Sequence, residues 1–299
     1  VDAKDVLITK RTSPLCNVPK MSFGNMPLDG GHLLLSDEEK TEFILKEPKA
    51  AKFIKPLISA YEFLNGQKRW CLWLVDDENT EIRQMRGVIK RVDLVKKFRL
   101  ASVRISTIKK AETPNEFGEI RDFGEAFIVV PRVSSENRKY IPLGFFDKNS
   151  IVSDTCMAIP NATFYHFGIL MSKMHMAWVK TVCGRLKSDF RYSKDIVYNN
   201  YPWPENPTEK QIKAIETAAQ NVLNARAEEP TWSLADFYDP LFMPSTLVKA
   251  HNELDKAVDS AYRSPSFTSE ANRMVFLFEL YEKYTATFFT KEKLKKTQK

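Results

Sequence analysis

The sequence predicts an α+β fold: a mixed domain with an antiparallel β-meander and packed helices, followed by a small all-α domain. Three observations favour this class. Hydrophobic residues make up 43% of the 299 residues, which suits a globular core better than a disordered chain. Three extended, β-rich runs lie close together in the middle of the chain. After Pro204 the pattern is helical throughout, so we place two domains at 1–204 and 205–299.

The first third of the chain is expected to mix short helices with one buried strand. Ser36 and Glu39 form a capping box, which predicts that a helix begins directly after Ser36. A second short helix is predicted over 49–60, and the apolar run at 69–76 suits a buried strand. Helical spacing of apolar residues predicts a longer helix over 80–102.

The rest of the chain passes from strands to helices. The runs GEAFIVVPRVS, RKYIPLGFFD and SIVSDTCMAIP are separated by turn-forming residues, which predicts the antiparallel meander. An apolar stripe predicts a helix after Asn161. Thr208 and Gln211 form a second capping box, and three helical stripes follow it.

The positive charge is concentrated in the first 204 residues, which hold 32 Lys and Arg against 24 Asp and Glu. The remaining 95 residues hold 13 against 14. A nucleic-acid-binding surface requires such an excess, although many ordinary proteins match it.

Other features of the composition limit the class of protein. No apolar run reaches the roughly 18 residues of a membrane span, and no signal peptide opens the chain. The four cysteines are scattered without a CxxC pair, which is typical of reduced thiols and argues against zinc. We expect a cytoplasmic, monomeric protein without membrane contact. The start at Val1, without a methionine, suggests a piece of a longer protein.

The most informative segment is GRLKSDFRYSK at 184–194, which follows an apolar helix. Lys187 and Asp189 lie two apart, so in an extended segment both side chains point to one side. Lysine donates to guanine O6 and N7 in the major groove, and aspartate accepts from cytosine N4. The pair could therefore address both halves of one G·C pair. The alternative is a solvated surface ion pair.

Neighbouring residues are candidate contacts to the DNA backbone. They could hold phosphates, which fixes the register of a protein on DNA without reading sequence. These residues are Arg185, Tyr192, Ser193 and Lys194. Tyr192 could instead complete the core.

We identify no catalytic motif and no metal or cofactor site. There is no G-x-S-x-G elbow, P-loop or G-x-G-x-x-G. The four histidines are too dispersed for a metal cluster, and we expect His166 and His175 to be satisfied core residues. Asp29, Glu38 and Lys40 resemble the acid–x–Lys layout of a metal-dependent nuclease. The capping box, however, places Lys40 in the first turn of a helix, whereas a nuclease needs that lysine on a strand.

Longer motifs carry a resemblance to a known family. The segments are FGNMPLDGGHLLLS, FLNGQKRWCLWL, YIPLG, IPNATFYHFGIL and HMAWVKTVCGRLKSDFRYSKDIVYNNYPWP. They resemble the C-terminal part of the type IIL, MmeI-like restriction–modification enzymes, which are large bacterial adenine-specific DNA methyltransferases, many with a nuclease domain. The resemblance covers essentially the whole chain. It implies a target recognition domain, then a helical C-terminal domain, with double-stranded DNA as the partner.

The resemblance also implies a division of labour. In the family, catalysis belongs to an upstream domain of the same polypeptide that binds S-adenosylmethionine and carries an Asn/Asp-Pro-Pro-Tyr/Phe motif. The 299 residues contain no Pro-Pro pair. The chain is therefore expected to recognise DNA without methylating it and to hold no cofactor itself.

The family's base-reading residues align with positions in this chain. A pair two apart, just after a Gly-Arg-(Leu/Ile) turn, specifies the base pair beside the methylated adenine and aligns with Lys187 and Asp189. The Lys/Asp combination implies G at that position of the methylated strand. Thr155 and Arg191 align with residues that read a neighbouring position.

Two functions of other classes are kept beside this one. A stand-alone metal-dependent nuclease would need Asp29 or Glu38 for cleavage. A protein-interaction module of a phage-defence complex would dock through the helical domain. RNA binding has less support, because no RNP-type aromatic motif is present.

Overall fold

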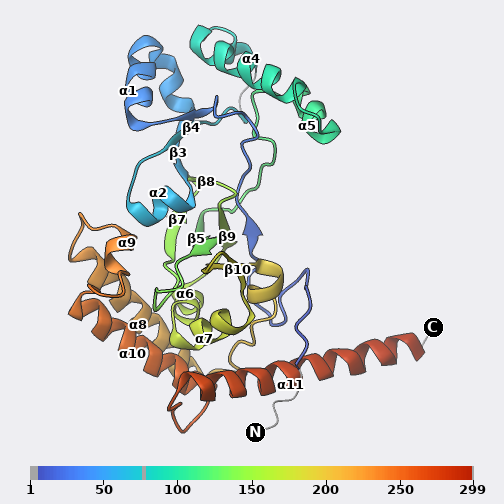
Figure 1. The fold of residues 1–299 in the computed structure, drawn as a ribbon, viewed down its shortest axis with the longest axis vertical. Helices are drawn as coiled ribbons and strands as arrows, with labels where there is room; N and C mark the ends of the chain where they lie inside the picture. Colours follow the sequence, from blue (N-terminus) through green and yellow to red (C-terminus); the bar gives the residue numbers. More distant parts are fainter. Residues whose placement is uncertain (1–5, 76–78, 298–299) are drawn as a thin grey trace. The chain divides into compact units, whose positions relative to one another are not determined.

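The computed structural model describes residues 6–75 and 79–297, and Figure 1 shows the course of the chain. The chain divides into two compact units, each discontinuous in sequence. Unit 1 comprises 1–22, 130–144 and 159–299, and unit 2 comprises 23–129 and 145–158.

Unit 2 is built on a four-stranded sheet of order β2-β4-β3-β8. The strands are β2 (Leu34–Leu35), β3 (Ile54–Ile58), β4 (Trp70–Leu72) and β8 (Ile151–Val152). Strand β4 is antiparallel to β2 and β3, whereas β8 pairs with β3 in parallel. The helices of unit 2 are α1 (Asp37–Lys46), η1 (Pro48–Phe53), α2 (Ala60–Asn65), α3 (Asn79–Ile82), α4 (Arg86–Leu100), α5 (Ile105–Lys109) and η2 (Lys110–Glu112). Strand β3 is therefore interior, with a neighbour on each side.

Local sequence signals explain part of unit 2. The capping box before α1 is confirmed: the Ser36 hydroxyl accepts from the backbone N–H of Glu39, and the Glu39 carboxylate accepts from that of Ser36. The predicted helix over 49–60 is wrong beyond Phe53, because residues 54–58 pair with β4 and β8 as strand β3. Such pairing joins residues far apart in sequence, which local periodicity does not report. The predicted helix over 80–102 is divided between α3 and α4.

A fully buried arginine ties α4 to the loops beside it. The Arg99 guanidinium donates to five backbone carbonyls, those of Pro27, Leu28, Lys110, Thr113 and Glu116. Its side chain is 0% exposed. Every hydrogen bond that a buried polar group makes offsets the loss of water, so this arrangement fixes the C-terminal end of α4.

A second four-stranded sheet contains the predicted β-rich runs. Its order is β1-β9-β5-β7, with β1 (Ser22–Phe23), β5 (Ala126–Pro131), β7 (Gly144–Asp147) and β9 (Cys156–Pro160). The first run therefore lies between the other two, which differs from a consecutive meander. The reason is that the chain, after β7, enters the other sheet, where β8 pairs with β3. It then returns as β9, which lies on the edge of β5 opposite β7. The mixed α+β class with antiparallel pairing is confirmed.

Unit 1 combines a small sheet with most of the long helices. The sheet has the order β10-β11-β6, with β6 (Val133–Ser134), β10 (Gly184–Leu186) and β11 (Asp189–Arg191). The helices are α6 (Phe164–Leu170), α7 (Lys173–Val182), the π-helix η3 (Lys194–Tyr198), α8 (Glu209–Ala227), α9 (Leu234–Phe237), α10 (Ser245–Tyr262) and α11 (Glu270–Thr297). The helix expected after Asn161 is thus two helices, since Ser172 caps a second one.

The C-terminal helices form the core against which α6 and α7 pack (Figure 1). Gly168 allows α6 to approach α8 closely, because a Cβ there would lie 2.6 Å from Cγ2 of Ile215. Trp178 of α7 is 0% exposed, and its ring centroid lies 5.8 Å from those of Phe278 and Tyr281 in α11. Helix α7, which leads into strand β10, is therefore held in place by this packing against α11.

Candidate nucleic-acid interface

The segment predicted to contact DNA folds as a β-hairpin. Strands β10 and β11 pair antiparallel, with Leu186 opposite Asp189, and a two-residue turn of Lys187 and Ser188 joins them. Lys187 has a φ of 54°, in the left-handed region that non-glycine residues rarely adopt. The premise of an extended 187–189 segment is therefore wrong. The two side chains come from a turn and from a strand, and strand alternation does not place them on one side.

The tip of the hairpin is open to solvent while its base is anchored. The Arg185, Lys187 and Ser188 side chains are exposed, Leu186 is 50% exposed, and Asp189 is half-buried. Beneath them Phe190 is buried at 2%. An exposed turn on buried supports can present side chains to a ligand at little cost in ordering.

Two contacts brace the hairpin from the neighbouring turn after β6. The Glu136 carboxylate lies 3.6 Å from Nη1 of Arg185, and the Glu136 backbone N–H donates to Oδ1 of Asp189 over 3.4 Å. Arg185 also donates to the carbonyl of Ser188 at 3.0 Å, and its guanidinium lies over the Phe190 ring. Arg185, expected as a phosphate contact, thus also holds the turn in shape.

Arg138, in the same neighbouring turn, adds positive charge near Asp189. Burial lowers the pKa of Arg138, and the charges of Asp189 and Asp239 oppose that shift. Sequence reasoning missed both Glu136 and Arg138. The sequence predicts only that 134–137 forms a turn. This turn lies beside the hairpin because β6 pairs with β11, and such non-local pairing leaves no local sequence pattern.

A buried hydrogen bond secures the strand that leaves the hairpin. The hydroxyl of Tyr192 lies 2.9 Å from Nε2 of His175, whose Nδ1 lies 2.9 Å from the carbonyl of Leu170. Burial lowers the pKa of His175 to about 4 and raises that of Tyr192 well above its ordinary value. His175 is the satisfied core histidine that the sequence predicts. Tyr192 is 3% exposed, so it completes the core and its hydroxyl is removed from the candidate phosphate contacts.

The remaining hairpin candidates lie at or beyond β11. Arg191, the last residue of β11, is exposed. Ser193 precedes the π-helix η3 and is half-buried. Nζ of Lys194 lies 2.6 Å from a carboxylate oxygen of Asp195. These two side chains are 21% and 34% exposed, so a phosphate at Lys194 has to compete with Asp195 for the ammonium.

Thr155 lies in unit 2, in the loop between β8 and β9. Its side chain is exposed, and its Oγ1 accepts from the backbone N–H of Ala60 at 2.9 Å. Thr155 and the hairpin therefore belong to different units.

The nuclease layout is contradicted by the structure. Asp29 is 4% exposed, and its carboxylate accepts from the backbone N–H groups of Gly31 and Leu33 at 3.0 and 2.7 Å. This acid shapes a tight turn. Lys40 lies in α1, with Nζ 3.2 Å from the ring centroid of Trp70. Among the side chains that the structure describes, no three His, Cys, Asp or Glu gather as metal ligands.

No helix in the described part of the chain is both long and apolar enough to cross a membrane.

Two domain families match consecutive parts of the chain. Residues 2–205 match the family described as "MmeI, target recognition domain", and residues 207–289 match "MmeI, C-terminal domain". The first match covers well over half of the chain, so the chain belongs to the MmeI target recognition domain family. The resemblance drawn from the sequence motifs is confirmed.

Two relatives show how this chain compares with longer proteins. DNA methyltransferase A of Bacillus subtilis (strain 168) is 42% identical over 284 residues, which is 95% of this chain and 32% of that protein. A structure of the type IIL restriction–modification enzyme MmeI in complex with DNA is similar with a TM-score of 0.92 and 45% identity. That similarity covers 96% of this chain and 38% of the MmeI chain. The chain thus spans about a third of the length of these relatives.

Proposed function

We propose that the chain reads the sequence of duplex DNA for an adenine-N6 methyltransferase domain of the same polypeptide. The observation that carries this proposal is the β10–β11 hairpin, which has Lys187 in its exposed turn and the half-buried Asp189 at the start of the following strand. The family membership and the MmeI–DNA complex of the similar structure support DNA as the ligand.

Direct readout is assigned to the hairpin and to one residue of unit 2. The ammonium of Lys187 donates to guanine O6 and N7, and the carboxylate of Asp189 accepts from cytosine N4. Together they read one G·C pair in the major groove. Arg191 and Thr155 read a neighbouring position. Each good contact of this kind discriminates by about 1–3 kcal/mol against the wrong base.

Contacts to the DNA backbone set the register. Arg185, Ser193 and Lys194 hold phosphates around the hairpin, and such contacts carry no sequence information themselves. Residues 1–204 act as the recognition domain, while 205–299 support it through the packing of α8, α10 and α11 against α6 and α7.

The methyl transfer is assigned outside these residues. S-adenosylmethionine, bound to the methyltransferase domain, supplies the methyl group, and an Asn/Asp-Pro-Pro-Tyr/Phe motif cannot lie in a sequence without a Pro-Pro pair. The chain contributes by binding and orienting the duplex while that domain acts on an extruded adenine. We place the protein in the cytoplasm as a monomer.

The test is DNA binding as a function of salt. If Arg185 and Lys194 neutralise two phosphates, the affinity for a duplex falls by roughly tenfold between 50 and 200 mM salt. Lys194→Gln should reduce the slope of log K against log salt by about 1. Ser260→Ala, far from the hairpin in sequence and exposed in α10, is the control and should leave the slope unchanged. Salt-independent binding contradicts the proposal.

A further inference from the structure

Unit 2 contains a cavity whose floor is one face of its sheet. Lys55 in β3 lies opposite Cys71 in β4, so Trp73, two residues further along, is a diagonal neighbour on the same face. Leu57, two residues from Lys55, lies opposite Ile151 in β8. Side chains two apart on a strand share a face, so the register places Lys55, Trp73 and Ile151 together.

The loop at 120–124 forms the wall above this face. The Arg121 backbone N–H donates to Oδ1 of Asn25 at 2.6 Å, and Asp122 accepts from the backbone N–H of Gly124 at 2.8 Å. These bonds hold the loop in place. The cavity is partly open to solvent and has a volume of about 330 Å³. This volume lies at the lower end of the range of small-molecule sites.

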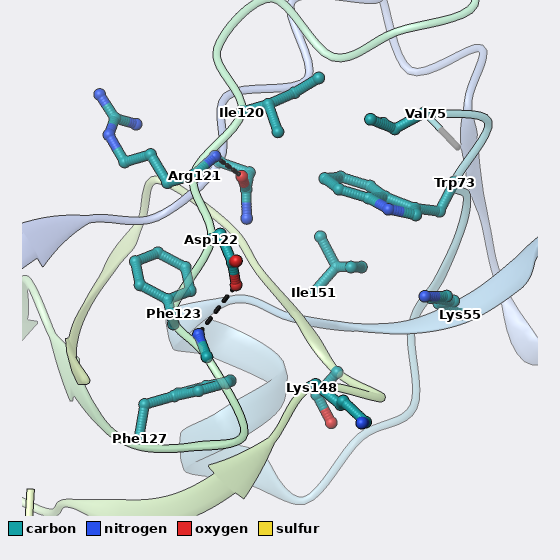
Figure 2. Close-up of a pocket in the computed structure, with 13 residues that line it drawn as sticks. Lys55, Trp73, Val75, Ile120, Arg121, Asp122, Phe123, Phe127, Lys148 and Ile151 are labelled. Carbon is teal, nitrogen blue, oxygen red and sulfur yellow. Dashed lines mark hydrogen bonds between the residues drawn. The ribbon is translucent and has the colours of Figure 1, made fainter. Parts of the chain in front are cut away.

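The chemistry of the cavity is aromatic on its walls and cationic at its rim. Figure 2 shows Trp73, Phe123 and Phe127 beside it, with Lys55 and Lys148 opposite Arg121. Phe123 and Phe127 are 5% and 1% exposed, so the half-buried Trp73 supplies the ring that a ligand can reach. Within the described residues, no carboxylate lies within 4 Å of the Lys55 ammonium. Lys148 pairs with Glu125 at 2.8 Å, but both side chains are more than 60% exposed, so that pair is weak and exchangeable.

We propose that this cavity binds a single nucleotide, with its base against Trp73 and its phosphate on Lys55 and Lys148. Aromatic rings stack on any base, and the two ammonium groups complement a phosphate. The Asp122 carboxylate can accept from an exocyclic amino group, so the cavity favours a base that carries one. The site lies in unit 2 and does not depend on base reading by the hairpin in unit 1.

Two sources supply the same chemistry: a free nucleotide, or a nucleotide extruded from DNA. The first arm of the test titrates the protein with dAMP, dTMP, deoxyadenosine and inorganic phosphate by calorimetry. We expect dAMP to bind more tightly than dTMP, and more tightly than either of its two parts. The second arm compares a duplex holding one unpaired adenine with a fully paired duplex. Preference for the unpaired duplex, abolished by excess dAMP, identifies extrusion as the source.

Variants locate the site and guard against misfolding. Lys55→Met keeps the aliphatic stem and should weaken nucleotide binding roughly tenfold or more. Trp73→Leu should weaken the binding of dAMP and leave the binding of inorganic phosphate unchanged. Lys68→Met, an exposed lysine outside the cavity, is the matched control and should bind as the wild type. Thermal unfolding verifies that each variant is folded.

Three results overturn the proposal. The first is that neither dAMP nor the unpaired duplex binds in a manner sensitive to Lys55→Met. The second is phosphate binding as tight as dAMP, since the aromatic wall then contributes nothing. The third is equal loss in the Lys68→Met control. The base selectivity of the hairpin is measured separately. If that selectivity is present while nucleotide binding at the cavity fails, only the cavity proposal is wrong and the proposed function stands.

Discussion

The Nε2 atom of His175 lies 2.9 Å from the hydroxyl of Tyr192, and this buried contact joins helix α7 to the strand that leaves the β10–β11 hairpin. Because Nδ1 of His175 donates to the Leu170 carbonyl, Nε2 is the acceptor and Tyr192 is the donor. The hairpin is therefore oriented by helix α7, which itself packs against the C-terminal helices.

Removing the Tyr192 hydroxyl should destabilise the protein. Tyr192→Phe leaves the buried Nε2 of His175 without a donor, which costs about 1–3 kcal/mol of the free energy of unfolding. Urea denaturation measures this loss. Tyr61→Phe, at a tyrosine that is 61% exposed, is the control and should be neutral. Equal stability of the two variants contradicts the buried contact.

The same histidine should make stability depend on pH. Burial lowers the folded-state pKa of His175 to about 4, whereas the unfolded value is 6.5. The unfolded chain therefore binds a proton between these pH values that the folded chain does not. The stabilisation is complete above pH 6.5 and is lost as the pH falls through about 4, a difference on the order of 3 kcal/mol. Unfolding free energies at pH 7 and 4.5 should differ less in His175→Gln than in the wild type; parallel losses refute the assignment.

Lys187 should lower the stability of the fold while it contributes to base selectivity. Its φ of 54° suits glycine, so Lys187→Gly is expected to stabilise the fold by up to about 1 kcal/mol. Lys187→Ala removes the same charge without relieving the backbone. Both variants should lose selectivity for the G·C pair, and only the glycine variant should gain stability. A gain in stability for both variants would instead point to charge as the cause.

Glu136 should act on selectivity through the hairpin brace. Glu136→Ala removes the ion pair to Arg185, and an exposed pair of this kind is worth about 0.2–1 kcal/mol. We expect selectivity between duplexes that differ in one base pair to fall roughly two- to fivefold. Non-specific affinity should hold or rise slightly, because a negative charge is lost. Competition binding measures both quantities. If the affinities for the preferred duplex and for the non-specific duplex fall by the same factor, Glu136 has no positioning role.

Local signals in the sequence predicted the elements that local interactions determine. The capping boxes at Ser36 and Thr208 mark the starts of α1 and α8, because a cap involves only four consecutive residues. The apolar spacing likewise found α4 and the helix that carries Trp178. The strand at 54–58 was missed because its hydrogen bonds come from β4 and β8.

The candidate site was located in sequence but not in shape. The run of cations and one acid after Gly184 marked the hairpin, yet the turn at Lys187 was missed because lysine rarely adopts positive φ. Glu136 lies 49 positions before Arg185, and only the pairing of β6 with β11 brings them together. Tyr192 left two readings open, and burial decides between them.

The most direct test of base reading by the hairpin is an exchange of its two reading residues. The wild type and the double variant Lys187→Asp with Asp189→Lys are each mixed with duplexes randomised at one base pair, and the bound DNA is sequenced. The exchange reverses donor and acceptor, so the account predicts a G·C preference in the wild type and a different base pair in the variant. Identical preferences in the two proteins, with binding intact, contradict it.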